Sequence, residues 1–143
     1  EIIEHYFESF PSIKDYMEET LESARSKGYV ETLTGRRRYL PDVQSANGTI
    51  RSMAERNAIN APIQGTAADM IKLAMSAIWR AMEERSFESR LVLQVHDELV
   101  FDLEESEQQE IEPLVRESMI HALPLEVPIE VEIGSGVHWL EAH

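Results

Sequence analysis

The chain has 143 residues, of which 43% are hydrophobic, and it contains no cysteine. This length predicts one domain spanning residues 1–143, and the lack of cysteine excludes disulfides, thiol nucleophiles and zinc sites built on thiolates. Thirteen basic against 27 acidic residues give a formal charge of −14, which argues against a polyanionic partner unless the basic residues gather on one face.

Targeting signals are missing from the chain. No apolar stretch approaches the roughly 20 residues that span a bilayer, and no signal peptide opens the sequence. We therefore expect an intracellular, cytoplasmic protein. Glu1 takes the place of an initiator methionine and lies inside an apolar helical pattern, so we expect a piece of a longer protein.

Residues 2–27 predict two helices. Apolar side chains at helical spacing run over residues 2–10, and Pro11 ends or bends that segment. We expect Ser12 to cap a second helix that ends at Gly28, because glycine favours the left-handed conformation of a helix terminus. Both helices are expected to be scaffold.

A β-hairpin is predicted over residues 29–40, where two short β-prone runs flank a Thr-Gly pair. The second run carries Arg36, Arg37 and Arg38. In a strand, Arg36 and Arg38 share one face, and Arg37 lies on the other. Guanidinium groups chelate phosphate oxygens, so a phosphate backbone is one natural partner. The alternative is a solvated edge strand whose charges prevent further strand pairing.

The longest helical pattern runs over residues 50–85. Pro62 and Gly65 lie inside it, so we expect the helix to bend or restart there. Its apolar stripe consists of Ile63, Ala67, Met70, Ala74, Ile78 and Ala81.

A polar stripe lies on another face of this helix. Arg56, Asn60 and Gln64 are four residues apart and therefore stack one above another. Their donors can reach the acceptor atoms that every base pair presents in the DNA minor groove. Polar residues on one side of a helix more often face solvent, so the residues alone leave both interpretations open.

Residues 91–101 predict a second hairpin, because His96, Asp97 and Glu98 interrupt an apolar, β-branched run. The side chains expected on one side of its first strand are Leu91, Leu93 and Val95. Histidine and aspartate tolerate the left-handed conformation, so a strained tight turn is feasible at the polar triplet. Adjacent carboxylates repel unless a hard cation such as Mg²⁺ lies between them, so Asp97 and Glu98 are candidate metal ligands. The alternative is a solvated turn.

The last third predicts a helix followed by a strand. Ser106 and Gln109 have the spacing of a capping box, and Pro113 is expected to move the helix start toward Glu112. The expected inner face of this helix consists of Ile111, Leu114, Val115 and Met119. Apolar side chains alternate with glutamate or proline over residues 127–133, which predicts a half-buried strand.

Several stretches together resemble family A DNA polymerases, in the right order and over nearly the whole chain. They are GYVETL at 28–33, GRRRY at 35–39, AER at 54–56, NAPIQGTAAD at 60–69 and LQVHDE at 93–98. The last of these resembles that family's motif C. A match of this extent is far more specific than any single motif.

The resemblance implies an α+β fold, in which an antiparallel sheet of the polymerase palm carries the motif C hairpin and packs against long α-helices. It implies a DNA-directed DNA polymerase that performs template-directed nucleotidyl transfer with two Mg²⁺ ions. By the same resemblance, Asp97 is a ligand of these ions, Glu98 supports the metal site, and His96 positions the primer end. The implied partners are primer–template DNA and a dNTP.

Two further implications concern DNA contacts and completeness. Arg56, Asn60 and Gln64 match family positions that touch the primer–template near the nascent base pair, and residues 36–38 match a region close to the duplex. The family's other metal-binding aspartate, in motif A, and its nucleotide-gripping fingers helix would lie upstream. We therefore expect this segment to be inactive alone and to need the remainder of the polymerase chain.

Two other functions are compared with the polymerase on the residues alone, and one of them stays open. One is a non-catalytic DNA-binding remnant of a family A polymerase that keeps Arg56, Asn60 and Gln64 without turnover. The other is an HD-type metal phosphohydrolase, which needs several histidine ligands. We set the second aside, because none of the five histidines is paired with another at helical spacing.

Overall fold

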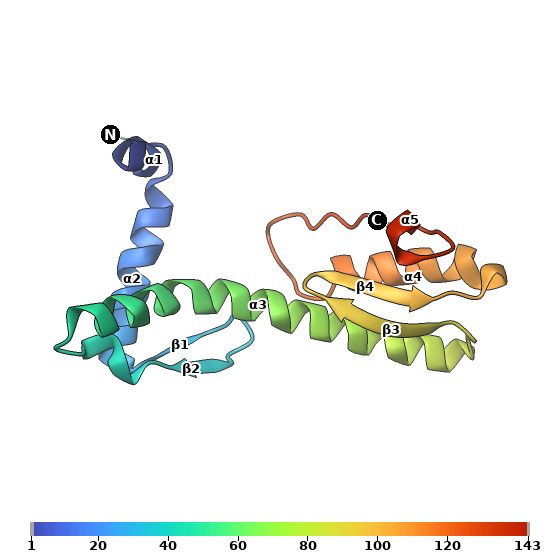
Figure 1. The fold of residues 1–143 in the computed structure, drawn as a ribbon, viewed down its shortest axis with the longest axis horizontal. Coiled ribbons are helices and arrows are strands. Elements are labelled where there is room, and N and C mark those ends of the chain that lie inside the picture. Colours follow the sequence, from blue (N-terminus) through green and yellow to red (C-terminus); the bar gives the residue numbers. More distant parts are fainter. Residues whose placement is uncertain (1, 143) are drawn as a thin grey trace. The chain divides into compact units, whose positions relative to one another are not determined.

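The computed structural model describes residues 2–142. Its elements in chain order are α1 (Ile2–Ser9), α2 (Pro11–Lys27), β1 (Tyr29–Glu31), β2 (Arg37–Tyr39), the 3₁₀ helix η1 (Pro41–Gln44), α3 (Gly48–Arg85), β3 (Arg90–Val95), β4 (Glu98–Asp102), the 3₁₀ helix η2 (Glu105–Glu107), α4 (Gln108–Ile120) and α5 (Trp139–Ala142). Two compact units, Glu1–Thr66 and Ala67–His143, divide the chain, and α3 contributes to both (Figure 1). Helices with two small antiparallel sheets confirm the α+β prediction. No helix among the described residues is long and apolar enough to cross a membrane.

The two N-terminal helices form as predicted, with one difference at the start of α2. Gly28 adopts a φ of 77° and donates its N–H to the carbonyl of Ala24, which ends α2 as expected. Ser12 is not the cap. Phe10 precedes the helix instead, and Pro11 occupies its first position, where a missing N–H leaves no hydrogen bond unmade.

The core of the first unit is built largely from small side chains. Its buried residues are Ala24, Val30, Leu40, Val43, Ala54 and Ala58. Alanines on α2 and α3 let the two helices approach closely. Polar contacts reinforce the same pair, because the Tyr16 hydroxyl donates to the Ile59 carbonyl at 3.0 Å and Arg25 pairs with Glu55 at 2.6 Å.

Helix α3 is one uninterrupted helix of 38 residues. Asn47 caps it by accepting the N–H groups of Thr49 and Ile50 on its side-chain oxygen. The helix passes through Pro62, so of the two expected outcomes, a bend or a restart, the restart does not occur. The expected apolar stripe is only partly right, because Ala74 and Ile78 are buried but Ile63 is 61% exposed.

The core of the second unit lies between α3, α4 and the β3–β4 hairpin. Its buried residues are Ile78, Met82, Ile111 and Val115. The side chains packed against them are Phe87, Leu99, Phe101, Leu103, Leu114 and Met119. All four residues expected on the inner face of α4 are in this cluster, so that prediction is confirmed.

Strands β3 and β4 pair antiparallel with one irregularity. Leu91 lies opposite Phe101, whereas Leu93 lies opposite Val100, so Val92 is an extra residue. Directly opposite residues share a side of a sheet, and the β-bulge therefore moves Leu93 to the side away from Leu91. The prediction that Leu91 shares one side with Leu93 and Val95 is wrong for this reason.

The strand predicted over residues 127–133 does not form within the described chain. The alternation agrees with exposure only over residues 129–133, where Ile129, Val131 and Ile133 are half-buried and Glu130 is exposed. The first apolar residue of the pattern, Val127, is 68% exposed. The backbone there takes other partners, as where the Arg116 guanidinium donates to the Val131 carbonyl. An alternating pattern predicts which side chains are covered but not whether a neighbouring strand supplies a ladder.

The start of α4 also differs from the prediction. No side-chain hydrogen bond caps it, so the capping box of Ser106 and Gln109 does not form. Pro113 lies inside the helix and does not move its start toward Glu112.

Glu107, just before α4, binds the segment that leads into β3. Its carboxylate accepts the N–H groups of Glu88 at 2.9 Å and Ser89 at 3.0 Å. The Ser89 hydroxyl in turn accepts the N–H of Glu104 at 2.8 Å. Burial would raise the pKa of Glu107, but the hydrogen bonds from Glu88 and Ser89 hold this pKa below its usual value.

We predict that Glu107→Gln lowers the free energy of unfolding more at neutral than at acid pH. A carboxyl whose pKa is lower in the folded state stabilises the fold above its unfolded pKa, and this contribution is lost as the pH falls through the folded pKa. Urea unfolding near pH 7 and near pH 3, followed by circular dichroism, measures the difference. Glu105→Gln, on the same turn, is the control. An equal loss at both pH values would contradict the prediction.

Candidate functional site

The turn between β3 and β4 is a strained tip, as predicted. His96 has a φ of 52°, in the left-handed region that non-glycine residues rarely adopt. The Gln94 side chain donates to the His96 carbonyl at 2.6 Å and holds the turn in place. Strain of this kind persists where the surrounding structure enforces it, and it is concentrated at functional sites.

The two acidic residues of the tip differ in their surroundings. Asp97 is exposed, and within residues 2–142 its carboxylate has no hydrogen bond or ion pair. Glu98 begins β4, lies opposite Val95 and is half-buried. The tip therefore presents one unpaired carboxylate beyond the strands, with a second carboxylate beside it in the sequence.

Carboxylate oxygens are the donors that Mg²⁺ prefers, so Asp97 and Glu98 fit a hard cation by their chemistry. No cluster of three or more histidine, aspartate or glutamate residues that could hold a metal is present in the described part of the chain. Asp97 and Glu98 would therefore supply only part of a coordination shell. Water, phosphate oxygens or other carboxylates would complete it.

The three adjacent arginines have different partners. Arg36 donates to the carbonyl of Gly65 at 3.0 Å. Arg37 donates to the Glu31 carboxylate at 2.8 Å, and its guanidinium lies 4.5 Å above the ring of Tyr29. The hydrogen bond with Glu31 is the main cause that raises the pKa of Arg37. Arg38 has no hydrogen bond or ion pair among residues 2–142.

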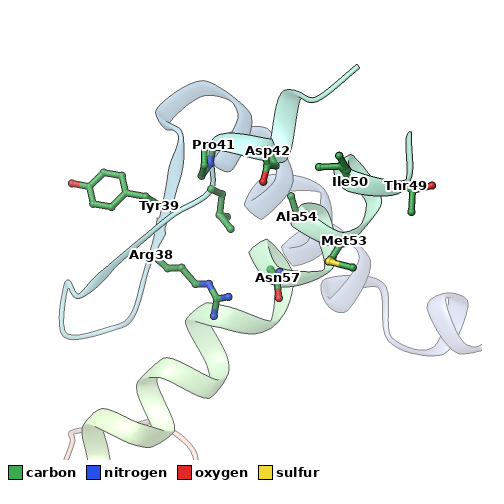
Figure 2. Close-up of a pocket in the computed structure, with 10 residues that line it drawn as sticks. Arg38, Tyr39, Pro41, Asp42, Thr49, Ile50, Met53, Ala54 and Asn57 are labelled. Carbon is green, nitrogen blue, oxygen red and sulfur yellow. The ribbon is translucent and has the colours of Figure 1, made fainter. Parts of the chain in front are cut away.

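Arg38 lines a shallow hollow of about 270 Å³ in the first unit. Figure 2 shows its guanidinium reaching toward Asn57 of α3, while the ring of Tyr39 points away. Ile50 and Met53 supply an apolar wall. The sequence did not indicate Asn57, because it lies about 100° around the helix from Arg56 and outside the polar stripe.

The polar stripe on α3 forms as predicted. Arg56, Asn60 and Gln64 are exposed on one uninterrupted helix, so their spacing of four keeps them on one face. None of the three has a hydrogen bond or ion pair within the described residues. They are therefore available to an external ligand. This stripe and the arginines belong to the first unit, and the carboxylate tip belongs to the second.

Comparison with known proteins identifies the family. Residues 1–141 match the family described as DNA polymerase family A. The chain belongs to this family. DNA polymerases of family A depend on metal ions in general, which agrees with the acidic tip.

The chain is about half identical to DNA polymerase I of several bacteria. It is 51% identical to the thermostable DNA polymerase I of Thermus filiformis over 98% of its length, and 50% identical to DNA polymerase I of Mycobacterium leprae over 96%. DNA polymerase I of Bacillus subtilis is 50% identical over 98% of the chain. The chain spans only 15–17% of the length of these relatives.

A solved structure matches the family A chain closely. It is the POL domain of Pol1 from M. smegmatis, described as a complex with DNA primer-template and dNTP. The TM-score is 0.96 and the sequence identity 50%. The match covers 98% of this chain and 25% of the other.

The positive φ at the tip generates a stability prediction. We expect His96→Val to lower the free energy of unfolding by about 1–2 kcal/mol, because a β-branched residue fits the left-handed region poorly. His96→Asn should have little effect, since asparagine tolerates that conformation. Urea unfolding of both variants measures this difference. Equal losses for the two variants would show that the backbone conformation is not the cause.

Proposed function

We propose that this chain is the part of a DNA-directed DNA polymerase that carries the motif C hairpin, and that it takes part in template-directed nucleotidyl transfer during DNA replication or repair. The observation that carries the proposal is Asp97, an unpaired carboxylate at a turn strained by the left-handed His96. A two-residue hairpin turn needs a positive φ at this position, which glycine or asparagine would adopt with less strain. The choice of histidine there, beside an unpaired carboxylate, favours a functional role for the tip.

The proposed partners are primer–template DNA, a dNTP and the rest of the polymerase chain. The POL domain of Pol1 from M. smegmatis supports these partners, because it is 50% identical in sequence and is described as a complex with DNA primer-template and dNTP. A cytoplasmic location goes with this function, since the DNA of a bacterium lies there.

In the reaction, the primer 3′-oxygen bonds to the α-phosphorus of the dNTP, and pyrophosphate leaves. We propose that Asp97 holds Mg²⁺, with two ions in the complete enzyme, and that Glu98 supports the same site. Bound Mg²⁺ would offset the charge that develops on the attacking and leaving oxygens. The hydrogen bond from Gln94 fixes the turn, so the Asp97 carboxylate is aimed before substrate arrives. His96, next to it, would position the primer end.

The polar stripe on α3 would recognise the shape of the base pairs. Every Watson–Crick pair presents acceptors in the minor groove, and Asn60 and Gln64 carry amide donors that reach them without distinguishing the bases. Arg56, one turn earlier on the same face, would contact the same strands. Contacts of this kind favour correctly paired bases whatever the DNA sequence.

Charge is distributed in keeping with this proposal. Residues 1–66 carry eight basic and ten acidic residues, against five and 17 in residues 67–143. The formal charge of −14 therefore arises almost entirely in the second unit. Of the three adjacent arginines, Arg38 is the one we propose to bind a DNA phosphate, because Arg36 and Arg37 already have partners within the fold.

Replacing Asp97 by Asn in the polymerase that contains this segment tests the proposal. We expect kcat to fall by about 100-fold or more with the fold unchanged, because the amide keeps the shape but removes the charge that holds the metal. Primer extension measures kcat, and circular dichroism checks that the fold is unchanged. Asp102→Asn, at the other end of β4, is the matched control and should retain activity. Full activity of the Asp97→Asn enzyme would contradict the role of Asp97 as a metal ligand.

A second prediction separates the arginines. Arg38→Ala should weaken DNA binding for all sequences and reduce the slope of log K against log salt by about 1. Arg37→Ala should leave the slope unchanged, because its guanidinium is held by Glu31 and Tyr29. Fluorescence anisotropy over a range of salt concentrations measures the slopes. An unaltered slope for Arg38→Ala would mean that this arginine binds no phosphate.

A further inference from the structure

The tip of the β1–β2 hairpin is fastened to a single turn of α3. The Arg36 guanidinium donates to the Gly65 carbonyl at 3.0 Å. The backbone N–H of Leu33 donates to the Thr66 hydroxyl at 3.0 Å, and that hydroxyl donates to the Pro62 carbonyl at 2.6 Å. Thr66 is only 8% exposed, so the two hydrogen bonds of its hydroxyl are partly shielded from water, whereas the bond from Arg36 is exposed.

This turn is also where α3 has the least support of its own. Pro62 has no N–H to donate to the Ala58 carbonyl, and its ring crowds that carbonyl. A threonine hydroxyl that bonds back to a carbonyl four residues earlier further favours bending. The position of the turn therefore depends on contacts from outside the helix.

Gly65 is what allows the hairpin to come this close. A Cβ atom at this position would lie 2.5 Å from Cγ2 of Thr32, which is too close for any real contact. Thr32 cannot easily turn away, because its hydroxyl accepts the N–H of Arg36 at 3.1 Å and lies 2.9 Å from the hydroxyl of Thr34. Helix propensity alone would favour alanine over glycine here, so the close approach is the reason for glycine.

The hairpin contacts α3 on its flank at Gly65, about 100° from Gln64, and on the side away from the polar stripe at Thr66. At about 100° per residue, Thr66 and Pro62 lie roughly 160° around the helix from Gln64 in either direction. Exposure agrees, since Gln64 is exposed and Thr66 is buried. A shift of this turn would therefore also move the Gln64 side chain on the opposite face.

We propose that the hairpin tip, residues 32–36, braces this turn of α3 and sets the position of Asn60 and Gln64 against the primer–template, with Gly65 and Thr66 as positioning residues. The inference rests on the proposed function, because it assigns the brace a role only if the stripe contacts DNA. Displacement of a positioning group by about 1 Å can cost up to about 100-fold in rate. The brace thereby links a small hairpin to the discrimination of correct from incorrect pairs.

The test uses the complete polymerase with four variants. Gly65→Ala should lower matched primer extension by about 10-fold or more and narrow the ratio of matched to mismatched extension. Thr32→Ser alone should behave like the unchanged enzyme, because it removes only the methyl group and keeps the hydroxyl. The double variant Gly65→Ala with Thr32→Ser should restore matched extension, and the ratio of matched to mismatched extension, to within about threefold of the unchanged enzyme. Gly48→Ala, where a Cβ atom meets only ordinary contact, is the matched glycine control.

A second pair of variants keeps the proposal testable if Gly65→Ala fails to fold. Thr66→Val removes the hydroxyl at nearly constant shape and should reproduce the loss of discrimination, whereas Thr66→Ser should preserve it. Unchanged discrimination in Thr66→Val and Gly65→Ala would overturn the brace. So would a Gly65→Ala defect that Thr32→Ser does not relieve.

Gln64→Ala in the same assay separates this inference from the proposed function. It should lower extension and discrimination with little change in melting temperature, because the side chain is exposed and unpaired among residues 2–142. If Gln64→Ala has no effect, the proposed DNA contact is wrong. If it has an effect and the Gly65 and Thr66 variants have none, only the brace is wrong.

Discussion

Helix α3 must pass Pro62 without breaking, and the rest of the structure depends on this continuity. A proline inside a helix costs about 3 kcal/mol relative to alanine. Hydrogen bonds from α2 and from the first hairpin surround the affected turn and offset part of that cost. Both hydrophobic cores take residues from this one helix, which are Ala54 and Ala58 in the first and Ile78 and Met82 in the second.

Features set by a single residue's backbone preference could be predicted from the sequence. Gly28 ends α2, and His96 takes a positive φ at the tip, because few other residues adopt that conformation readily. The path through Pro62 could not be predicted in this way. It depends on hydrogen bonds with residues 29 and 33 positions away, whose arrival at α3 no local pattern reveals.

The sequence also could not show which strands pair or which arginines have partners within the fold. The alternation indicates exposure correctly over residues 129–133 but not at Val127, and a strand also requires a neighbour with free N–H and C=O groups. The sequence does not distinguish the three adjacent arginines at 36–38. Only the fold shows that Arg36 and Arg37 have hydrogen-bond partners within the chain. The carboxylates and the polar stripe were found from sequence because short spacings on a helix or a turn already bring side chains together.

The bulge at Val92 restricts how this hairpin can evolve. Successive residues of a strand point to opposite sides, so one added or deleted residue between the bulge and the turn would reverse the parity of every position after it. Substitutions can accumulate along β3 while chain length there stays constant. Side chains on the hairpin can therefore be exchanged singly, whereas the number of residues from Val92 to Asp97 can change only if the whole tip is re-aimed.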